Sequence, residues 1–231
     1  LLSRSLKDQK SLDKVRSIAS LIQKTDPDIC MFTEVGGEES VFNLNKYFLG
    51  GIYDVIHFDS NSNRGIDLAI LIKPELKRNS KLHKEKVFAR GVIELEVSVG
   101  EKTLHFLLTH LKSKLNLSGK DFEGRSQRQA ELKQISYICK KIKKAKNHHP
   151  IIVGDLNGIM DKAAQDFELS DFATENGLRD ALEWLQKPDF DRFTYIYYNK
   201  HAELIKMQLD YFLVGSQIAK YLSEDSQVLD F

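Results

Sequence analysis

The stretch GVIELEVSVGEKTLHFLLTHL, residues 91–111, decides between two kinds of β-sheet. Its two apolar segments, 92–99 and 103–111, are joined by a tight turn at Gly100 and Glu101, which predicts an antiparallel hairpin. Elsewhere, helices separate the predicted strands. A hairpin within such an order argues against a purely doubly wound fold. It predicts an α+β protein with one mixed sheet, or with two packed sheets and helices outside.

The remaining elements follow from hydrophobic spacing and from the residues that interrupt it. Leu12, Val15, Ile18 and Ile22 recur at helical spacing, and Asp26-Pro27 ends this helix because the residue before proline avoids the helical region. The predicted helices span 8–24, 38–48, 124–146 and roughly 163–186. The other predicted strands span 28–34, 52–58, 66–72, 151–155, 193–198 and 209–214.

The composition is that of a soluble globular protein with a single domain over residues 1–231. Apolar residues make up 42% and charged residues 29% of the 231, and no linker-like segment interrupts them. No apolar run approaches the ~20 residues of a transmembrane helix, so we expect no membrane partner. No leader is visible, although the sequence does not begin with Met. Cys30 and Cys139 lie among apolar residues and are interpreted as buried free thiols.

The net charge of +1 hides a basic segment. Between His110 and Lys146 there are eleven Lys and Arg residues against three Asp and Glu residues, a local balance of +8. Four of the lysines, at 140, 141, 143 and 144, are explained as the solvated face of a helix. Lys112, Lys114, Arg125 and Arg128 lie elsewhere in the segment, near His110. A local basic patch on a nearly neutral protein favours a polyanionic partner.

The segment IIVGDLNGIM, residues 151–160, places Asp155 and Asn157 directly after a buried strand. Such a pair commonly makes a turn in which both side chains bond to nearby backbone. Polar residues also stand at the ends of other predicted strands: Glu34, His110 and Asp210. Each alone has an ordinary structural explanation, but scaffolds present catalytic groups at strand ends, so the set predicts a functional site.

The same motifs resemble those of the endonuclease/exonuclease/phosphatase superfamily, the deoxyribonuclease-I-like enzymes. The resemblance rests on PDICMFTEV (27–35), THLKSK (109–114), VGDLN (153–157) and LDYFLV (209–214), and it is nearest to the bacterial extracellular-nuclease-like branch. It implies two packed mixed β-sheets flanked by helices, a four-layer sandwich. It also favours a secreted or periplasmic protein.

The resemblance assigns a role to each strand-end residue. Glu34 matches the ligand of a divalent metal, Mg²⁺ or Mn²⁺, and Asp155 matches the aspartate that deprotonates the attacking water. Asn157 matches a donor to the phosphoryl oxygen, where a carboxylate would repel the phosphate. His110 matches a histidine that contacts the phosphate or serves the leaving oxygen. Asp210 matches an aspartate that orients a second histidine.

Further residues are expected to contact substrate. Lys112, Lys114 and Arg128 would rim the site and meet neighbouring phosphates. Phe193 and Tyr195 match a segment near the substrate, with core packing of a strand as the alternative. Arg64 and Asp67 lie beside a strand that often carries a substrate-facing residue. The pair His148-His149 has no counterpart in the resemblance and is interpreted as a surface turn.

The sequence departs from the family pattern at both ends, where the first strand and a final Ser-Asp-His segment are missing. The leading hypothesis is a metal-dependent phosphodiesterase acting on nucleic acid, a monomeric DNA endonuclease of low sequence specificity. The same residues would serve a phosphatase or phosphodiesterase acting on inositol phosphates or phospholipids. A catalytically inactive binding protein is the third reading, favoured by the missing Ser-Asp-His and opposed by the intact internal motifs.

Overall fold

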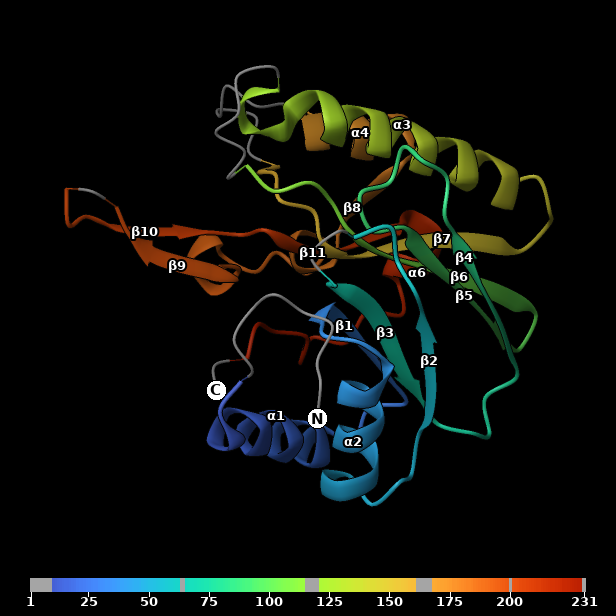
Figure 1. The fold of residues 1–231 in the computed structure, drawn as a ribbon. Helices are drawn as coiled ribbons and strands as arrows, with labels where there is room; N and C mark the ends of the chain where they lie inside the picture. Colours follow the sequence, from blue (N-terminus) through green and yellow to red (C-terminus); the bar gives the residue numbers. More distant parts are fainter. Residues whose placement is uncertain (1–9, 63–64, 115–120, 161–167, 200, 230–231) are drawn as a thin grey trace.

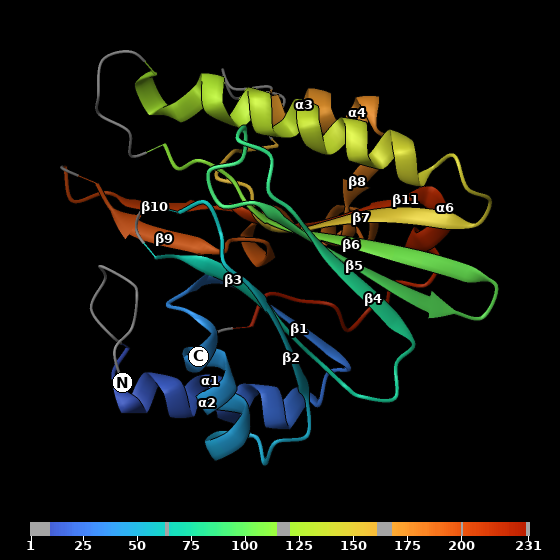
Figure 2. The same cartoon turned by 45° about the vertical axis from the view of Figure 1, so that its right-hand side comes forward.

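The computed structural model describes residues 10–62, 65–114, 121–160, 168–199 and 201–229. Within these ranges the strands form a three-stranded sheet, a six-stranded sheet and a two-stranded hairpin. Figures 1 and 2 show these elements in layers, with helices outside the small sheet, the small sheet against the large sheet, and further helices outside the large sheet. The α+β sandwich expected from the sequence is confirmed.

The small sheet is antiparallel throughout and has the order β1–β3–β2. Its strands are β1 (Ile29–Val35), β2 (Asp54–Phe58) and β3 (Asp67–Ile72). Helices α1 (Leu12–Thr25) and α2 (Glu38–Phe48) cover its outer face through a buried apolar cluster that includes Ile22, Val41 and Leu71. All six residues of β3 are buried because both faces of this central strand are covered.

The large sheet has the order β4–β5–β6–β7–β11–β8 and is mixed, because β6 and β7 run parallel. Its strands are β4 (Arg78–His83), β5 (Val92–Val99), β6 (Lys102–His110), β7 (His148–Asp155), β8 (Leu178–Asp180) and β11 (Asp210–Gly215). Helices α3 (Arg125–Ile142) and α4 (Glu168–Glu175) cover its outer face. The inner face packs on the small sheet through residues such as Ile70, Ile93 and Leu108.

The predicted hairpin of residues 92–111 is confirmed as β5 and β6, which pair in register from Val92 opposite Thr109 to Val99 opposite Lys102. Strand β4 was not predicted, because its sequence RNSKLH is polar and lies at the edge of the sheet. The helical region predicted over roughly 163–186 is confirmed only in part, because strand β8 interrupts it. Gly177, with φ of 58°, ends α4, and the chain continues as β8 and the short helix α5 (Ala181–Trp184). Residues 163–167 lie outside the described ranges.

The last third of the chain also carries a hairpin of β9 (Tyr195–Tyr198) and β10 (Leu204–Met207), which projects from the body in Figure 1. The remaining short elements are η1 (Phe122–Gly124), η2 (Asp189–Asp191) and α6 (Ser216–Ala219). Cys30 and Cys139 are free and buried, as expected, and burial raises the pKa of their thiols to about 11 and about 12. None of the described helices combines the length and apolarity needed to cross a membrane.

Candidate active site

Three predicted site residues lie side by side where strands of the large sheet meet. His110 ends β6 and is the register partner of Asp155, the last residue of the parallel strand β7. Asp210 begins the antiparallel strand β11 and is the register partner of Asp155 on its other side. The His110 Nε2 atom lies 3.3 Å from Asp155 Oδ2. The sheet topology therefore brings together residues that are up to 100 positions apart in the sequence.

Gly154 permits this arrangement because it lies against the backbone of β6. A Cβ atom at this position would be 2.0 Å from the carbonyl oxygen of Thr109, and the backbone φ is 128°. Both facts exclude a side chain without a shift of the strand. The glycine that precedes Asp155 is therefore what allows β7 to approach β6 closely at the site.

Asn157 follows in a left-handed conformation, with φ of 49°, which asparagine tolerates better than most residues. Its backbone N–H donates to Asp155 Oδ1 at 2.9 Å, and its side-chain amide donates to the carbonyl of Leu111 at 3.1 Å. The side chain is buried. The turn geometry considered from the sequence is thus present, and it fixes Asn157 beside Asp155.

Glu34 reaches the same region from the small sheet. It is exposed and has φ of 58°, within an irregularity of the β1–β3 register between Phe32 and Val35. A bulge of this kind redirects a side chain out of the regular strand pattern. The negative charge of Glu34 acts on the carboxyl groups of both Asp155 and Asp210.

The carboxyl groups of the site are crowded and partly removed from water. Burial, followed by the charges of Asp210 and Glu34, raises the pKa of Asp155 to about 7, although the Asn157 N–H and Arg90 oppose the shift. Desolvation and the charge of Glu34 also raise the pKa of Asp210, against a hydrogen bond from Thr194. Three carboxyl groups therefore gather at one place, where the charge of one raises the pKa of another.

A divalent cation fits this donor set. Carboxylate oxygens are the ligands that Mg²⁺ and Mn²⁺ prefer. Burial is the main cause of the raised pKa values of Asp155 and Asp210, and repulsion between the carboxylates, which a cation would relieve, adds to it. Enzymes of the superfamily that the sequence motifs resemble generally use divalent metal ions.

A buried charged network, absent from the sequence predictions, holds the segment after β6. Arg90 donates to the carbonyls of His110 and Leu111 at 3.1 and 3.0 Å. Glu131 accepts from the backbone N–H groups of Ala89 and Lys112 at 2.8 and 2.9 Å. Both side chains are buried. In the sequence, Arg90 and Glu131 are distinguished only by their apolar neighbours, which is too weak a pattern to predict this network.

Arg128 belongs to the same support, and its expected place on the rim of the site is wrong. The residue is fully buried, and its guanidinium donates to the carbonyls of Lys112 and Glu123 at 3.1 and 2.7 Å. A buried guanidinium that bonds backbone on both sides fixes a loop and does not meet substrate phosphates. Lys112 and Lys114, in contrast, are half-buried and follow directly after His110.

The other predicted substrate residues differ in exposure and in the contacts they make. Tyr195 is 46% exposed at the start of the hairpin, and its ring lies 5.4 Å from that of Tyr197. Phe193 is half-buried beneath the ammonium of Lys206. The core-packing alternative for this segment is therefore wrong for the strand as a whole. Asp67 is buried and bonds the Ser60 N–H at 3.1 Å, so it holds a loop, while Arg64 lies outside the described residues.

His110 is also less accessible than expected. Only 3% of its side chain is exposed, and it lies behind Asp155. Such burial does not agree with direct contact between this imidazole and a phosphate, which is one of the two roles that the resemblance implied. Service to the leaving oxygen stays a prediction. Thr194 also supports the site, and the sequence analysis did not single it out. Its Oγ1 accepts from the backbone N–H groups of Leu209 and Asp210 at 2.9 and 3.0 Å.

Comparison with known proteins places this geometry in a family. The model of the Endonuclease/Exonuclease/phosphatase family matches residues 4–230. Zebrafish (D. rerio) TDP2, solved with a single-strand DNA product, is 21% identical over 91% of this chain and 80% of its own, with a TM-score of 0.66. The human Nocturnin catalytic domain is 17% identical over 92% and 78%, with a TM-score of 0.64.

A mannosyl-6-phosphatase of Bacteroides thetaiotaomicron is 15% identical over 92% of this chain and 83% of its own, with a TM-score of 0.59. At these identities the solved structures show a common fold alone. No curated protein matches the sequence. The family match over nearly the whole chain and the shared fold lead to one conclusion. The protein belongs to the endonuclease/exonuclease/phosphatase family, whose members hydrolyse phosphodiesters or phosphate esters.

Proposed function

We propose that this protein is a Mg²⁺- or Mn²⁺-dependent phosphodiesterase that cleaves nucleic acid, a DNA endonuclease of low sequence specificity. The observation that carries the proposal is the convergence of Asp155 with His110 and Asp210 at adjacent strand ends, with Glu34 acting on two of them from the other sheet. Carboxylates repel an anionic ester. This set of carboxylates therefore suits hydrolysis of such an ester only if a cation offsets their charge.

Asp155 is the proposed base. In the metal-free protein, burial raises its pKa to about 7, so this carboxylate is more basic than an ordinary aspartate. The Asn157 N–H holds one carboxylate oxygen, and His110 Nε2 lies 3.3 Å from the other, so the carboxylate has a fixed orientation. In this arrangement His110 is a positioning residue that acts through Asp155.

Asn157 is the proposed donor to a phosphoryl oxygen. One N–H of its amide is used on the Leu111 carbonyl, which fixes the side chain, and the amide carries a second N–H for the phosphate. Glu34 is the proposed ligand of the divalent ion, with Asp210 nearby. When bound, this ion would neutralise phosphate charge and lower the pKa of water.

Nucleic acid is the proposed substrate because basic and aromatic side chains lie beside the site. Lys112 and Lys114 follow His110 directly, and the β9–β10 hairpin adjoins Asp210 through Thr194 and presents Tyr195. Lysines bind phosphates and aromatic rings stack on bases. The zebrafish TDP2 structure with a single-strand DNA product supports the same class of substrate. Because one chain supplies every described site residue, we propose that it acts as a monomer.

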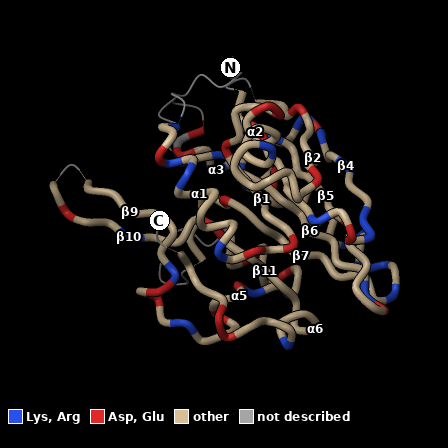
Figure 3. Tube along the Cα trace, turned by 90° about the horizontal axis from the view of Figure 1, so that it is seen from below, with Lys and Arg blue, Asp and Glu red and all other residues tan. Residues whose placement is uncertain are grey.

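The charge pattern favours a local contact over a uniformly basic surface. Figure 3 shows Lys and Arg interspersed with Asp and Glu over the face seen from below. Lys140 and Lys141 are exposed in the last turn of α3, and Lys143 and Lys144 are exposed just beyond its end, so only the first two lie on a solvated helix face. The phosphate contacts are therefore proposed to be few and close to the site.

The proposal is tested by incubating the protein with supercoiled plasmid and with single-stranded and duplex oligonucleotides, in Mg²⁺, Mn²⁺ or a chelator. We expect metal-dependent nicking that is lost in Glu34→Gln and Asp155→Asn. Absence of metal-dependent cleavage of every DNA substrate, by protein that melts cooperatively, would overturn the nuclease assignment. Release of phosphate from inositol phosphates or sugar phosphates under the same conditions would replace it with a phosphatase. Binding without turnover of either substrate class would identify the inactive binding protein.

A further inference from the structure

A row of charged and histidine side chains lies on the outer face of the large sheet, beneath helix α3 and away from the proposed active site. This His–Glu row consists of Lys81 and His83 on β4, Glu94 and Glu96 on β5, His105 on β6 and His148 on β7. A cavity of about 270 Å³ separates it from α3. Neighbouring positions on the same face, such as Val92 and Leu107, are apolar and pack on α3. The row is therefore a polar interruption of an apolar interface.

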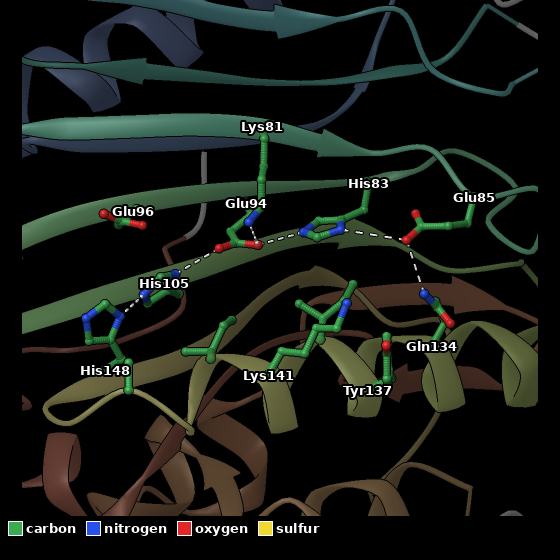
Figure 4. A pocket seen from close by; sticks show the side chains of 13 residues that line it. Lys81, His83, Glu85, Glu94, Glu96, His105, Gln134, Tyr137, Lys141 and His148 are labelled. Carbon is green, nitrogen blue, oxygen red and sulfur yellow. Dashed lines mark hydrogen bonds and ion pairs between the residues drawn. The ribbon is translucent and has the colours of Figure 1, made fainter.

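The members of the row are linked in series, as Figure 4 shows. Glu94 Oε1 lies 2.8 Å from His105 Nδ1, and Glu94 Oε2 lies 2.6 Å from His83 Nε2 and 3.1 Å from Lys81 Nζ. His105 Nε2 lies 2.8 Å from His148 Nδ1. His148, expected to lie in a surface turn, is instead the first residue of β7 and part of this series.

His148, at one end of the row, and Asp155 of the proposed active site lie at opposite ends of β7. At about 3.3 Å per residue, the seven intervening steps separate them by roughly 20 Å. A ligand bound to the row thus would not share donor atoms with Glu34 or Asp155.

The chemistry of the row suits a metal ion. Among the described residues, Glu94, Glu96 and His105 each offer a ligand atom, and these atoms all lie within 4.8 Å of one another. Glu94 and His105 are buried, and Glu96 is half-buried at the solvent side. Two carboxylates two residues apart on one strand face, opposite a histidine of the next strand, converge on one point because side chains on a strand alternate between faces.

We propose that Glu94, Glu96 and His105 form a second metal site, specific for Zn²⁺ or a similar transition-metal ion. An imidazole ligand favours zinc and its neighbours over Mg²⁺, which prefers oxygen atoms only. Donor atoms around a tetrahedral zinc ion lie about 3.3 Å apart, so the widest pair needs to converge by up to about 1.5 Å. Glu94 Oε1 and His105 Nδ1, now 2.8 Å apart, need to separate slightly to admit the ion. The cavity gives water access to the fourth coordination position.

The other members of the row act as positioning residues. Metal-bound histidines usually bond a partner through the second ring nitrogen, and His148 occupies that place for His105. His83 and Lys81 hold the second oxygen of Glu94 and leave the first directed at His105. Lys141, which also lines the cavity, places its ammonium 4.4 Å from the centre of the Tyr137 ring.

The experiment isolates this site by removing the other one. In the double variant Glu34→Gln/Asp155→Asn, freed of metal with a chelator, we expect calorimetric titration to show one equivalent of Zn²⁺ bound. Mg²⁺ should show no binding in this background. Addition of Glu96→Gln is expected to weaken zinc binding at least tenfold, and His148→Gln by about 10- to 100-fold. Zinc should raise the melting temperature of the double variant and not of its Glu96→Gln derivative.

Glu101→Gln, in the exposed turn of the β5–β6 hairpin, is the matched control and should leave zinc affinity unchanged. Glu96 is preferred to the buried His105 as the main test, because a half-buried side chain can be replaced without unfolding the chain. The proposal is overturned if the double variant binds no zinc, or if Glu96→Gln and Glu101→Gln bind it equally. Neither result depends on cleavage of any substrate, so failure of the proposed function is distinguished from failure of this site.

Discussion

Asp155 and Asp210 are direct partners across the antiparallel pair of β7 and β11, so two carboxylates face each other at the end of a sheet. Glu34 adds a third negative charge from the other sheet. Such a concentration of like charge opposes folding when no cation is present. The clustered carboxylates therefore lower the stability of the metal-free fold, and they provide a site at which a cation and an anionic ester can bind together.

Asp155→Asn is expected to abolish hydrolysis and to stabilise the metal-free fold. The folded-state pKa of Asp155 is about 7, above the usual value of 3.8, so the folded protein binds a proton more tightly than the unfolded chain. Stability from this group is present below the unfolded-state pKa and is lost as pH rises through 7. Asparagine keeps the acceptor for Asn157 and carries no charge. At pH 8 we expect about 1–3 kcal/mol more stability in urea denaturation, and no gain at pH 4.

A divalent cation should lower the pKa of Asp155. Its positive charge would oppose the repulsion from Asp210 and Glu34, which contributes to the present shift after burial. An NMR titration of carboxyl-labelled aspartates should show one group near pH 7 without metal, displaced to lower pH by saturating Mg²⁺. The displacement should vanish in Glu34→Gln. A titration that Mg²⁺ leaves unchanged would contradict Glu34 as the ligand.

Gly154→Ala is expected to destabilise the fold by roughly 2–4 kcal/mol and to reduce activity, because the new Cβ would displace β7 from the Thr109 carbonyl. Gly51→Ala is the matched control. Gly51 also has a positive φ, of 71°, but nothing lies within 4 Å of an added Cβ, so its cost should be roughly 1 kcal/mol. Chemical denaturation of both variants gives the comparison, and equal losses would refute the close-approach explanation.

Several parts of this structure could be predicted from sequence because local chemistry and tertiary packing agree there. The β5–β6 hairpin alternates around a tight turn, and the residues of the GDLN segment stand where a buried strand must end. Register then brings His110 and Asp210 to Asp155, which the order of motifs anticipated.

Other parts could not be predicted because some residues have a burial opposite to the one that their type and neighbours indicate. Arg128 has the sequence neighbourhood of a solvated helix face, yet it is fully buried and bonds backbone. The aromatic strand β9 has the pattern of a core strand, yet all its residues are exposed on a hairpin. Strand β4 is polar because it lies at a sheet edge and lines the His–Glu row.

Arg128→Met and Lys112→Gln should separate structural support from substrate contact. Arg128→Met leaves the carbonyls of Lys112 and Glu123 without a buried donor and should cost roughly 2–4 kcal/mol of stability.

Lys112→Gln keeps the length of the side chain and should change stability by less than about 0.5 kcal/mol. It should weaken DNA binding. It should also reduce the slope of log Kd against the logarithm of salt concentration by about 0.7–0.9, the contribution of one phosphate contact. A salt dependence equal to that of the unaltered protein would remove Lys112 from the substrate contacts.

Tyr195→Ala tests whether the exposed hairpin contacts nucleic acid. The ring is 46% exposed, pairs with Tyr197 and lies two residues from Phe193, so its loss should cost about 1–3 kcal/mol of single-stranded DNA affinity through stacking. Fluorescence anisotropy with a labelled oligonucleotide measures this as a roughly 5- to 150-fold rise in Kd. Tyr137→Ala on α3 removes an equally exposed tyrosine, 52%, beside the His–Glu row and is the control. If both variants bind DNA equally well, the hairpin is not part of the nucleic-acid surface, and Lys112 and Lys114 alone would have to position the strand.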